Sequence, residues 1–159
     1  MSDPPPLSSE PLRPLVERLA VEPRALLGLG IPRCPASELL AASLAEIAWA
    51  RPSTPVGYAL LAGPEDWALR EEVLWPRDIQ VSRSSVPSLC LMREGHAAAR
   101  RLGGGPAAAI DAWLCELLGP AERELVGEVT ERERRALSRH AARSAQHVSV
   151  KDSDRRGPG

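Results

Sequence analysis

Prolines and glycines divide this chain into short segments, and this restricts its fold more than any other feature of the sequence. Sixteen prolines and twelve glycines occur in 159 residues. Proline has no backbone N–H and restricts the residue before it, so it ends helices and is excluded from central strands. No apolar run between these breaks approaches the roughly 18 residues of a membrane-spanning helix. We therefore expect short elements packed into one domain, with no membrane span.

Three segments have the apolar spacing of a helix. The first starts near Arg13 and ends before Pro23. The second covers residues 36–50 and has Ser37 as its cap. The third follows Pro106 and carries an apolar face. A fourth, charged helix is expected over 121–145. The apolar positions of the first and third helices recur every three or four residues: Leu12, Leu15, Val16 and Leu19, then Ile110, Trp113, Leu114, Leu117 and Leu118.

The middle of the chain has a different pattern. Residues 24–29 are bounded by glycines and Pro32 and are expected to form a turn. Residues 56–62 fit a strand or a helix. Two short strands, 73–75 and 79–81, are expected to flank a turn, and 86–92 fits a third extended piece. The predicted fold class is mainly α, a small helical domain with a short central β-hairpin, and α+β is the alternative.

The ends of the chain differ in composition from the rest. Residues 1–9 contain three consecutive prolines, and 148–159 are rich in glycine, proline and aspartate. We expect a disordered leader over 1–9, a single globular domain over 10–147 and a disordered tail over 148–159. The first ten residues have no basic or apolar region typical of a secretory signal. Three unevenly spaced cysteines also favour a cytoplasmic protein.

One lysine, Lys151, stands against nineteen arginines. The preference for arginine, alanine and proline is typical of a GC-rich bacterial genome. Because the lysine falls in the predicted tail, the sequence excludes P-loop phosphate binding, kinase-type phosphoryl transfer and Schiff-base chemistry.

No catalytic or metal-binding motif is found in the sequence. The three cysteines show no Cys-x-x-Cys spacing, the three histidines show no His-x-x-x-His spacing, and no Gly-x-Ser-x-Gly is present. The Cys34–Pro35 pair is of a kind that can act as a haem-sensing thiolate, but one dipeptide does not specify such a site. The sequence therefore predicts no metal and no cofactor, and it favours a protein that is not an enzyme. The residues concerned are Cys34, Cys90, Cys115, His96, His140 and His147.

An arginine stripe is the first candidate binding surface. Arg132, Arg135, Arg139 and Arg143 fall on one face of the predicted last helix. From residue 132 onward there are eight basic and three acidic residues. Such a stripe can contact an acidic protein or nucleic-acid phosphates, and it is equally typical of a solvated helix face. The segment lacks stacking aromatic residues, which disfavours binding of single strands.

Three tryptophans are the second candidate surface. Trp49, Trp67 and Trp75 lie near element ends beside proline, aspartate or arginine. Amphipathic tryptophans at such places belong either to the core or to an interface.

These observations predict a non-catalytic, intracellular interaction or accessory protein, such as a chaperone, adaptor or assembly component, with a protein partner. The first alternative is a nucleic-acid-associated regulator that uses the arginine stripe. The second is an enzyme whose site residues are dispersed in the sequence. The oligomeric state is not predicted.

Overall fold

The computed structural model describes residues 4–125. Three short helical turns, Arg70–Leu74, Trp75–Arg77 and Arg83–Ser85, separate α3 from β3. The main elements follow one another in the order α1 (Leu12–Ala20), β1 (Arg24–Gly30), α2 (Pro35–Ala50), β2 (Val56–Leu60), α3 (Pro64–Leu69), β3 (Ser88–Arg93), β4 (His96–Leu102) and α4 (Ala107–Leu118).

The four strands form one mixed sheet in the order β2-β1-β3-β4. Strands β1 and β2 are parallel and are joined through α2, whereas β3 is antiparallel to both β1 and β4. Glu94 and Gly95 connect β3 to β4 with φ angles of 51° and 81°. Two residues with positive φ are typical of the tight turn that joins two antiparallel strands.

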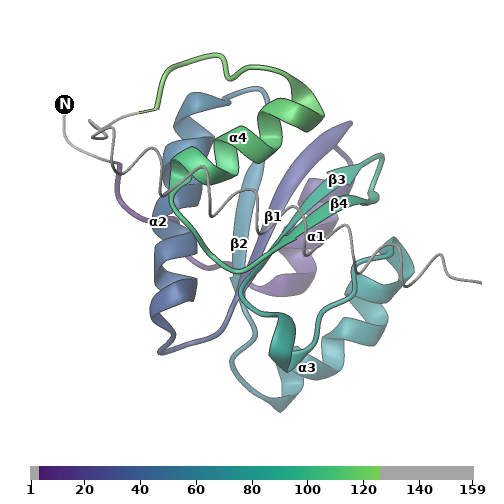
Figure 1. Ribbon diagram of the computed structural model, residues 1–159. Coiled ribbons are helices and arrows are strands. Elements are labelled where there is room, and N and C mark those ends of the chain that lie inside the picture. The colour runs from purple at the N-terminus through teal and green to yellow at the C-terminus, as the bar shows by residue number, and fades with distance from the viewer. Residues whose placement is uncertain (1–3, 126–159) are drawn as a thin grey trace, which may run out of the picture.

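Helices cover both faces of this sheet (Figure 1). One apolar cluster lies between the sheet and helices α2 and α4, and a second lies between the sheet and helices α1 and α3. In β1, Leu26 belongs to the α2 side and Leu27 to the α1 side. A strand that is buried on both faces is apolar throughout and lacks alternating polarity.

The predicted fold class is therefore wrong: the chain is α/β, not mainly α with a short hairpin. Residues 24–29 form the central strand β1 rather than a turn. Its glycines provide space instead of a bend, since a Cβ on Gly28 would lie 2.5 Å from Leu44 Cδ1. The glycines that predict a turn in the sequence instead allow helix α2 to pack closely on the strand.

The predicted hairpin is also misplaced. Residues 70–77 form helical turns, and the hairpin is made by β3 and β4. Strand β4 contains Ala97, Ala98 and Ala99, and alanine favours helices over strands. The helices predicted at 36–50 and after Pro106 are confirmed, as is the helix with its apolar face on Leu12 and Leu15.

Two other predictions fall mainly outside the described residues. Of the charged helix expected over 121–145, residues 121–125 are described and are not helical. The domain boundary at 147 is untested and stays a prediction. None of the helices described between residues 4 and 125 is long and apolar enough to cross a membrane.

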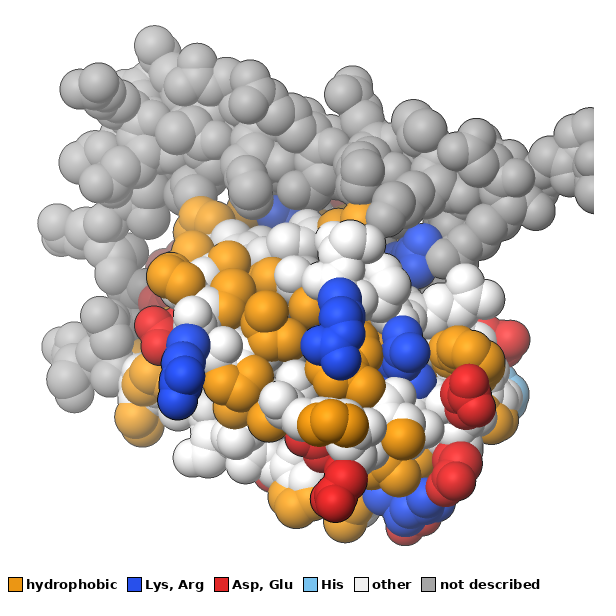
Figure 2. All heavy atoms as spheres, turned by 90° about the horizontal axis from the view of Figure 1, so that it is seen from below, with side chains coloured by type: hydrophobic (Ala, Val, Ile, Leu, Met, Phe, Trp, Pro, Cys, Tyr) orange, Lys and Arg blue, Asp and Glu red, His pale blue; other side chains and the backbone are white. Residues whose placement is uncertain are grey.

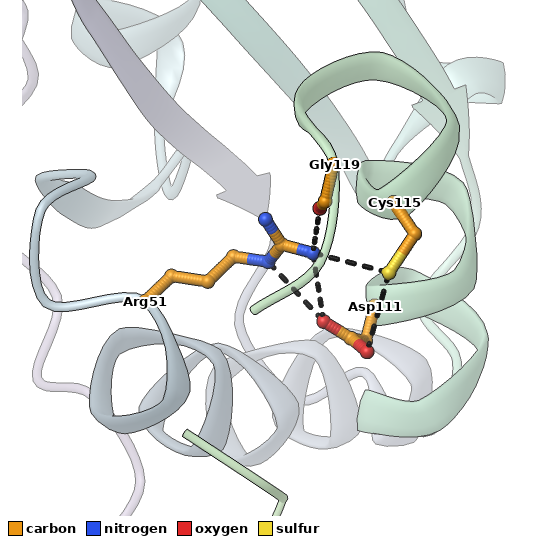
Figure 3. A network of polar contacts seen from close by, with 4 residues as sticks. All are labelled: Arg51, Asp111, Cys115 and Gly119. Carbon is orange, nitrogen blue, oxygen red and sulfur yellow. Dashed lines mark hydrogen bonds and ion pairs between the residues drawn. The ribbon is translucent and has the colours of Figure 1, made fainter. Parts of the chain in front are cut away.

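Arg51 joins the C-terminal end of α2 to α4 (Figure 3). Its side chain is 4% exposed and donates to Asp111 Oδ1 at 3.0 Å and to the Gly119 carbonyl oxygen at 3.0 Å. It also donates to the Cys115 sulfur at 3.3 Å. These contacts fix how the two helices pack on the same face of the sheet, and they lie at the opposite end of α2 from its first residue.

Candidate active site at the start of helix α2

Cys34 is the residue at which the segment after β1 becomes helix α2. Its backbone is extended, with φ −119° and ψ 113°, and Pro35 occupies the first helical position. Proline suits this position because its missing N–H has no partner there in any helix. The peptide dipoles of α2 place partial positive charge at this end, which favours a thiolate over a thiol.

The polar groups of the first turn act in the same direction. The pKa of Cys34 is lowered below its usual value of 9.0, chiefly by the neighbouring polar groups of Ser37 and Ala36. Partial burial and the charge of Glu38 oppose this shift, and the net direction is down. Cys34 is partly exposed, so its sulfur is both activated and accessible.

Ser37 is itself held by the strand that precedes it. The Ile31 backbone N–H donates to Ser37 Oγ at 3.0 Å. This bond fixes the Ser37 hydroxyl against the residue that follows β1. Ser37 is 1% exposed, so water does not compete for the hydroxyl.

The segment before β3 and the segment after β4 contact each other, and the second of them also contacts the start of α2. Pro87, joined to Val86 by a cis peptide bond, precedes β3, and its carbonyl oxygen accepts from Gly103 N–H at 2.8 Å. The next residue, Gly104, lies directly against α2, because a Cβ there would stand 2.5 Å from the Ala36 carbonyl oxygen. The glycine-rich segment after β4 is therefore packed on the first turn that follows Cys34.

Figure 2 views the molecule from the end at which α2 begins. Apolar side chains cover much of this end, and arginines and carboxylates are scattered singly among them.

The two other cysteines have different environments. Cys90 lies on β3 and lines a hollow of about 250 Å³, but burial raises its pKa to about 12. It is therefore a neutral thiol at physiological pH and a poor nucleophile. Cys115 is exposed on α4 and takes part in the Arg51 network, where its thiol also faces Asp111 Oδ2 at 3.7 Å. No group of three or more His, Cys, Asp or Glu side chains in residues 4–125 forms a metal site.

The residues predicted as binding surfaces are described only in part. Arg132, Arg135, Arg139 and Arg143 lie outside the described residues. Trp67 is 6% exposed, and the guanidinium groups of Arg70 and Arg83 lie 5.1 and 4.6 Å from its ring centre.

The other two tryptophans are more accessible. Trp49 is partly buried, with Arg123 at 5.5 Å from its ring, and Trp75 is 47% exposed. Their role at an interface stays a prediction.

The absence of Cys-x-x-Cys spacing gives no reason to select Cys34 as a candidate nucleophile from the sequence. The residue three positions later is Ser37, so the segment reads Cys-Pro-Ala-Ser. The signal that was available is a cysteine followed by proline at the start of a helix, directly after an apolar segment. Recognising it required identifying residues 24–30 as a strand.

The sequence and the fold were compared with those of known proteins. No family model and no curated protein matches the sequence. Chlamydomonas reinhardtii thioredoxin f2 is similar in structure, with a TM-score of 0.55 and 14% identity over 72% of this chain and 98% of that one. Oxidised thioredoxin from Plasmodium falciparum gives a TM-score of 0.51 and 12% identity over 65% of this chain and 89% of that chain. Mitochondrial thioredoxin 3 from Saccharomyces cerevisiae gives 0.50 and 12%, over 67% and 92%.

These matches show that the fold is that of the thioredoxins. The interpretation of the chain as a helical, non-catalytic accessory protein is wrong, because its structural neighbours are α/β redox proteins. The alternative of a nucleic-acid regulator is not supported by these neighbours either.

Proposed function

We propose that this protein exchanges thiols and disulfides through a single cysteine, Cys34. The observation that carries the proposal is the position of Cys34, partly exposed at the start of α2 and close to Ser37, where the pKa of its thiol is lowered. The thioredoxin-like fold supports it, since thiolates at the start of a helix are the nucleophiles of such chemistry.

The reaction has two balanced steps. In the first, the Cys34 thiolate attacks one sulfur of a substrate disulfide; the substrate S–S bond breaks, a Cys34–substrate disulfide forms, and the second substrate sulfur leaves as a thiolate. In the second, the thiolate of an external thiol attacks the mixed disulfide. This step releases the substrate group as a disulfide with the external thiol and restores the Cys34 thiolate.

The external thiol is needed because Ser37 replaces the usual second cysteine. In a Cys-x-x-Cys site the second thiol attacks the mixed disulfide from within the same chain. Ser37 cannot do this, Cys90 is a buried neutral thiol, and Cys115 lies at the other end of α2. The mixed disulfide is therefore expected to persist until a low-molecular-weight thiol arrives.

Three unevenly spaced cysteines favour a reducing compartment, and the proposal therefore includes a cytoplasmic location.

The test is the reaction of the full chain with oxidised glutathione near neutral pH. Peptide mass spectrometry locates the adduct and measures its rate at each cysteine. We expect an adduct at Cys34 that forms faster than at exposed Cys115 and is reversed by reduced glutathione. Cys34→Ser should abolish this adduct, whereas Cys115→Ser should leave its rate unchanged. Equal rates at Cys34 and Cys115 in the wild-type chain would overturn the proposal.

A further inference from the structure

Tyr58 is the only tyrosine in the chain and lies on β2, beneath the first turn of α2. It is 4% exposed and belongs to the apolar cluster between the sheet and α2. Its hydroxyl donates to the Ser37 carbonyl oxygen at 3.1 Å. A phenol buried among apolar side chains has few ways to satisfy its hydroxyl, so this contact fixes the ring and the helix turn together.

Gly30 makes the contact possible. A Cβ at Gly30 would overlap the Tyr58 hydroxyl oxygen and would stand 2.9 Å from both Cβ and Oγ of Ser37. The tyrosine hydroxyl therefore reaches the first turn of α2 through the space that glycine leaves at the end of β1.

Ser37 is consequently fixed at two separate atoms. Its carbonyl accepts from Tyr58 on β2, and its hydroxyl oxygen accepts from Ile31 after β1. The polar groups of Ser37 are the largest cause of the lowered pKa of Cys34. The Tyr58 bond therefore restrains the residue on which the thiol depends most.

We propose that Tyr58 is a positioning residue for Cys34, acting through Ser37 and not by contact with a substrate. The inference rests on the proposed thiol–disulfide activity and adds a residue, Tyr58, that contacts Ser37. The tyrosine stays a donor throughout the working range, because burial raises its pKa above 10.0. The charged groups around Cys34, Arg33 before it and Glu38 one turn on, are unchanged when only the Tyr58 hydroxyl is removed.

The experiment measures the rate at which iodoacetamide alkylates Cys34 as a function of pH in the full chain. The Cys34 peptide is quantified by mass spectrometry, so Cys90 and Cys115 do not contribute. Tyr58→Phe keeps the ring and removes the hydroxyl. We expect the midpoint of the Cys34 profile to rise by about 0.5 pH unit, which corresponds to about threefold less thiolate well below the midpoint.

Ile47→Val provides the matched control. Ile47 lies on α2 in the same apolar cluster, and the loss of one methylene there costs about 1 kcal/mol, comparable to the loss of one hydrogen bond. This variant should unfold at a lower temperature and keep the wild-type Cys34 profile.

The inference is overturned if Tyr58→Phe leaves the profile in place, or if Ile47→Val moves it equally. A wild-type midpoint at the value of an ordinary cysteine overturns the proposed function instead, so the two failures are distinguishable.

Discussion

Gly30 and Tyr58 lie so close that a methyl group on Gly30 would occupy the position of the Tyr58 hydroxyl. The same methyl group would also press on Ser37, whose Cβ and Oγ would be 2.9 Å away. The end of β1 is therefore the point at which the sheet determines where the first turn of α2 lies.

Gly30→Ala should displace Ser37 from Cys34. We expect a higher midpoint in the Cys34 alkylation profile and a loss of about 1–3 kcal/mol in the free energy of unfolding, because the added carbon overpacks a buried site. Urea unfolding and the alkylation profile together measure both effects. Gly63→Ala is the control, since a Cβ at Gly63 meets no atom within 4 Å. An unchanged Cys34 profile in Gly30→Ala would contradict this account.

Ser37→Cys should convert the site from one thiol to two. The residues at the start of a helix and three positions later lie on the same side, at a distance that a disulfide spans. We expect oxidised glutathione to produce an internal disulfide between Cys34 and the introduced thiol in this variant, with the glutathione adduct at Cys34 short-lived. Intact mass before and after alkylation distinguishes the two products. Accumulation of the glutathione adduct to the wild-type level would show that the new thiol cannot reach Cys34.

The sequence is sufficient to predict the helices but not the sheet. The apolar face of Leu12, Leu15 and Leu19 and that of Ile110 and Leu114 have the helical period, and both helices are present. Strand β1 has no alternation because both of its faces are buried, and its glycines admit Leu44 and Tyr58. What those glycines contact comes from segments far away in the chain, so no local pattern reveals their role.

The candidate site could not be predicted from the sequence either, because it also depends on contacts between distant segments of the chain. The pKa of Cys34 is lowered by Ser37, which is near in sequence, and Ser37 is held by Tyr58, which is 21 residues away. The spacing of Cys34 and Ser37 is readable from the sequence, but its meaning depends on a strand ending just before it. The hairpin of β3 and β4 could not be predicted either, because the three alanines of β4 favour a helix.

Arg51→Met should destabilise the fold without changing the chemistry of Cys34. The substitution removes the donor shared by Asp111, Cys115 and the Gly119 carbonyl and leaves a partly buried carboxylate unpaired. We expect a loss of about 3 kcal/mol in the free energy of unfolding. Glu72→Gln is the control, since it breaks the exposed Arg13–Glu72 pair and should cost less than about 1 kcal/mol. Equal costs in urea unfolding would contradict the role assigned to Arg51.

Cys90 should make the protein less stable at alkaline pH. Burial raises its pKa from 9.0 to about 12, so below pH 9 the thiol is protonated in both the folded and the unfolded chain. Between these values the unfolded thiol ionises and the folded one does not, and the free energy of unfolding falls by about 1.4 kcal/mol per pH unit. The Cys34 thiol changes the free energy of unfolding in the opposite direction. Because its pKa is lowered in the folded chain, it adds stability as pH rises, and the effect is complete once pH exceeds 9.0. Tyr58, with its raised pKa, also lowers stability above pH 10.

Cys90→Ala isolates the contribution of this thiol, because Cys34 and Tyr58 titrate equally in both proteins. The alanine variant starts less stable, since a cavity replaces the sulfur. Between pH 9 and pH 11 its disadvantage should shrink by about 2 kcal/mol, because the wild-type chain loses the stability that depends on a protonated Cys90 and the variant has no such thiol. Urea unfolding at several pH values measures the difference directly. Parallel curves for the two proteins over this range would mean that the Cys90 thiol ionises as readily in the folded chain as in the unfolded one, and that the hollow beside β3 admits water to the sulfur.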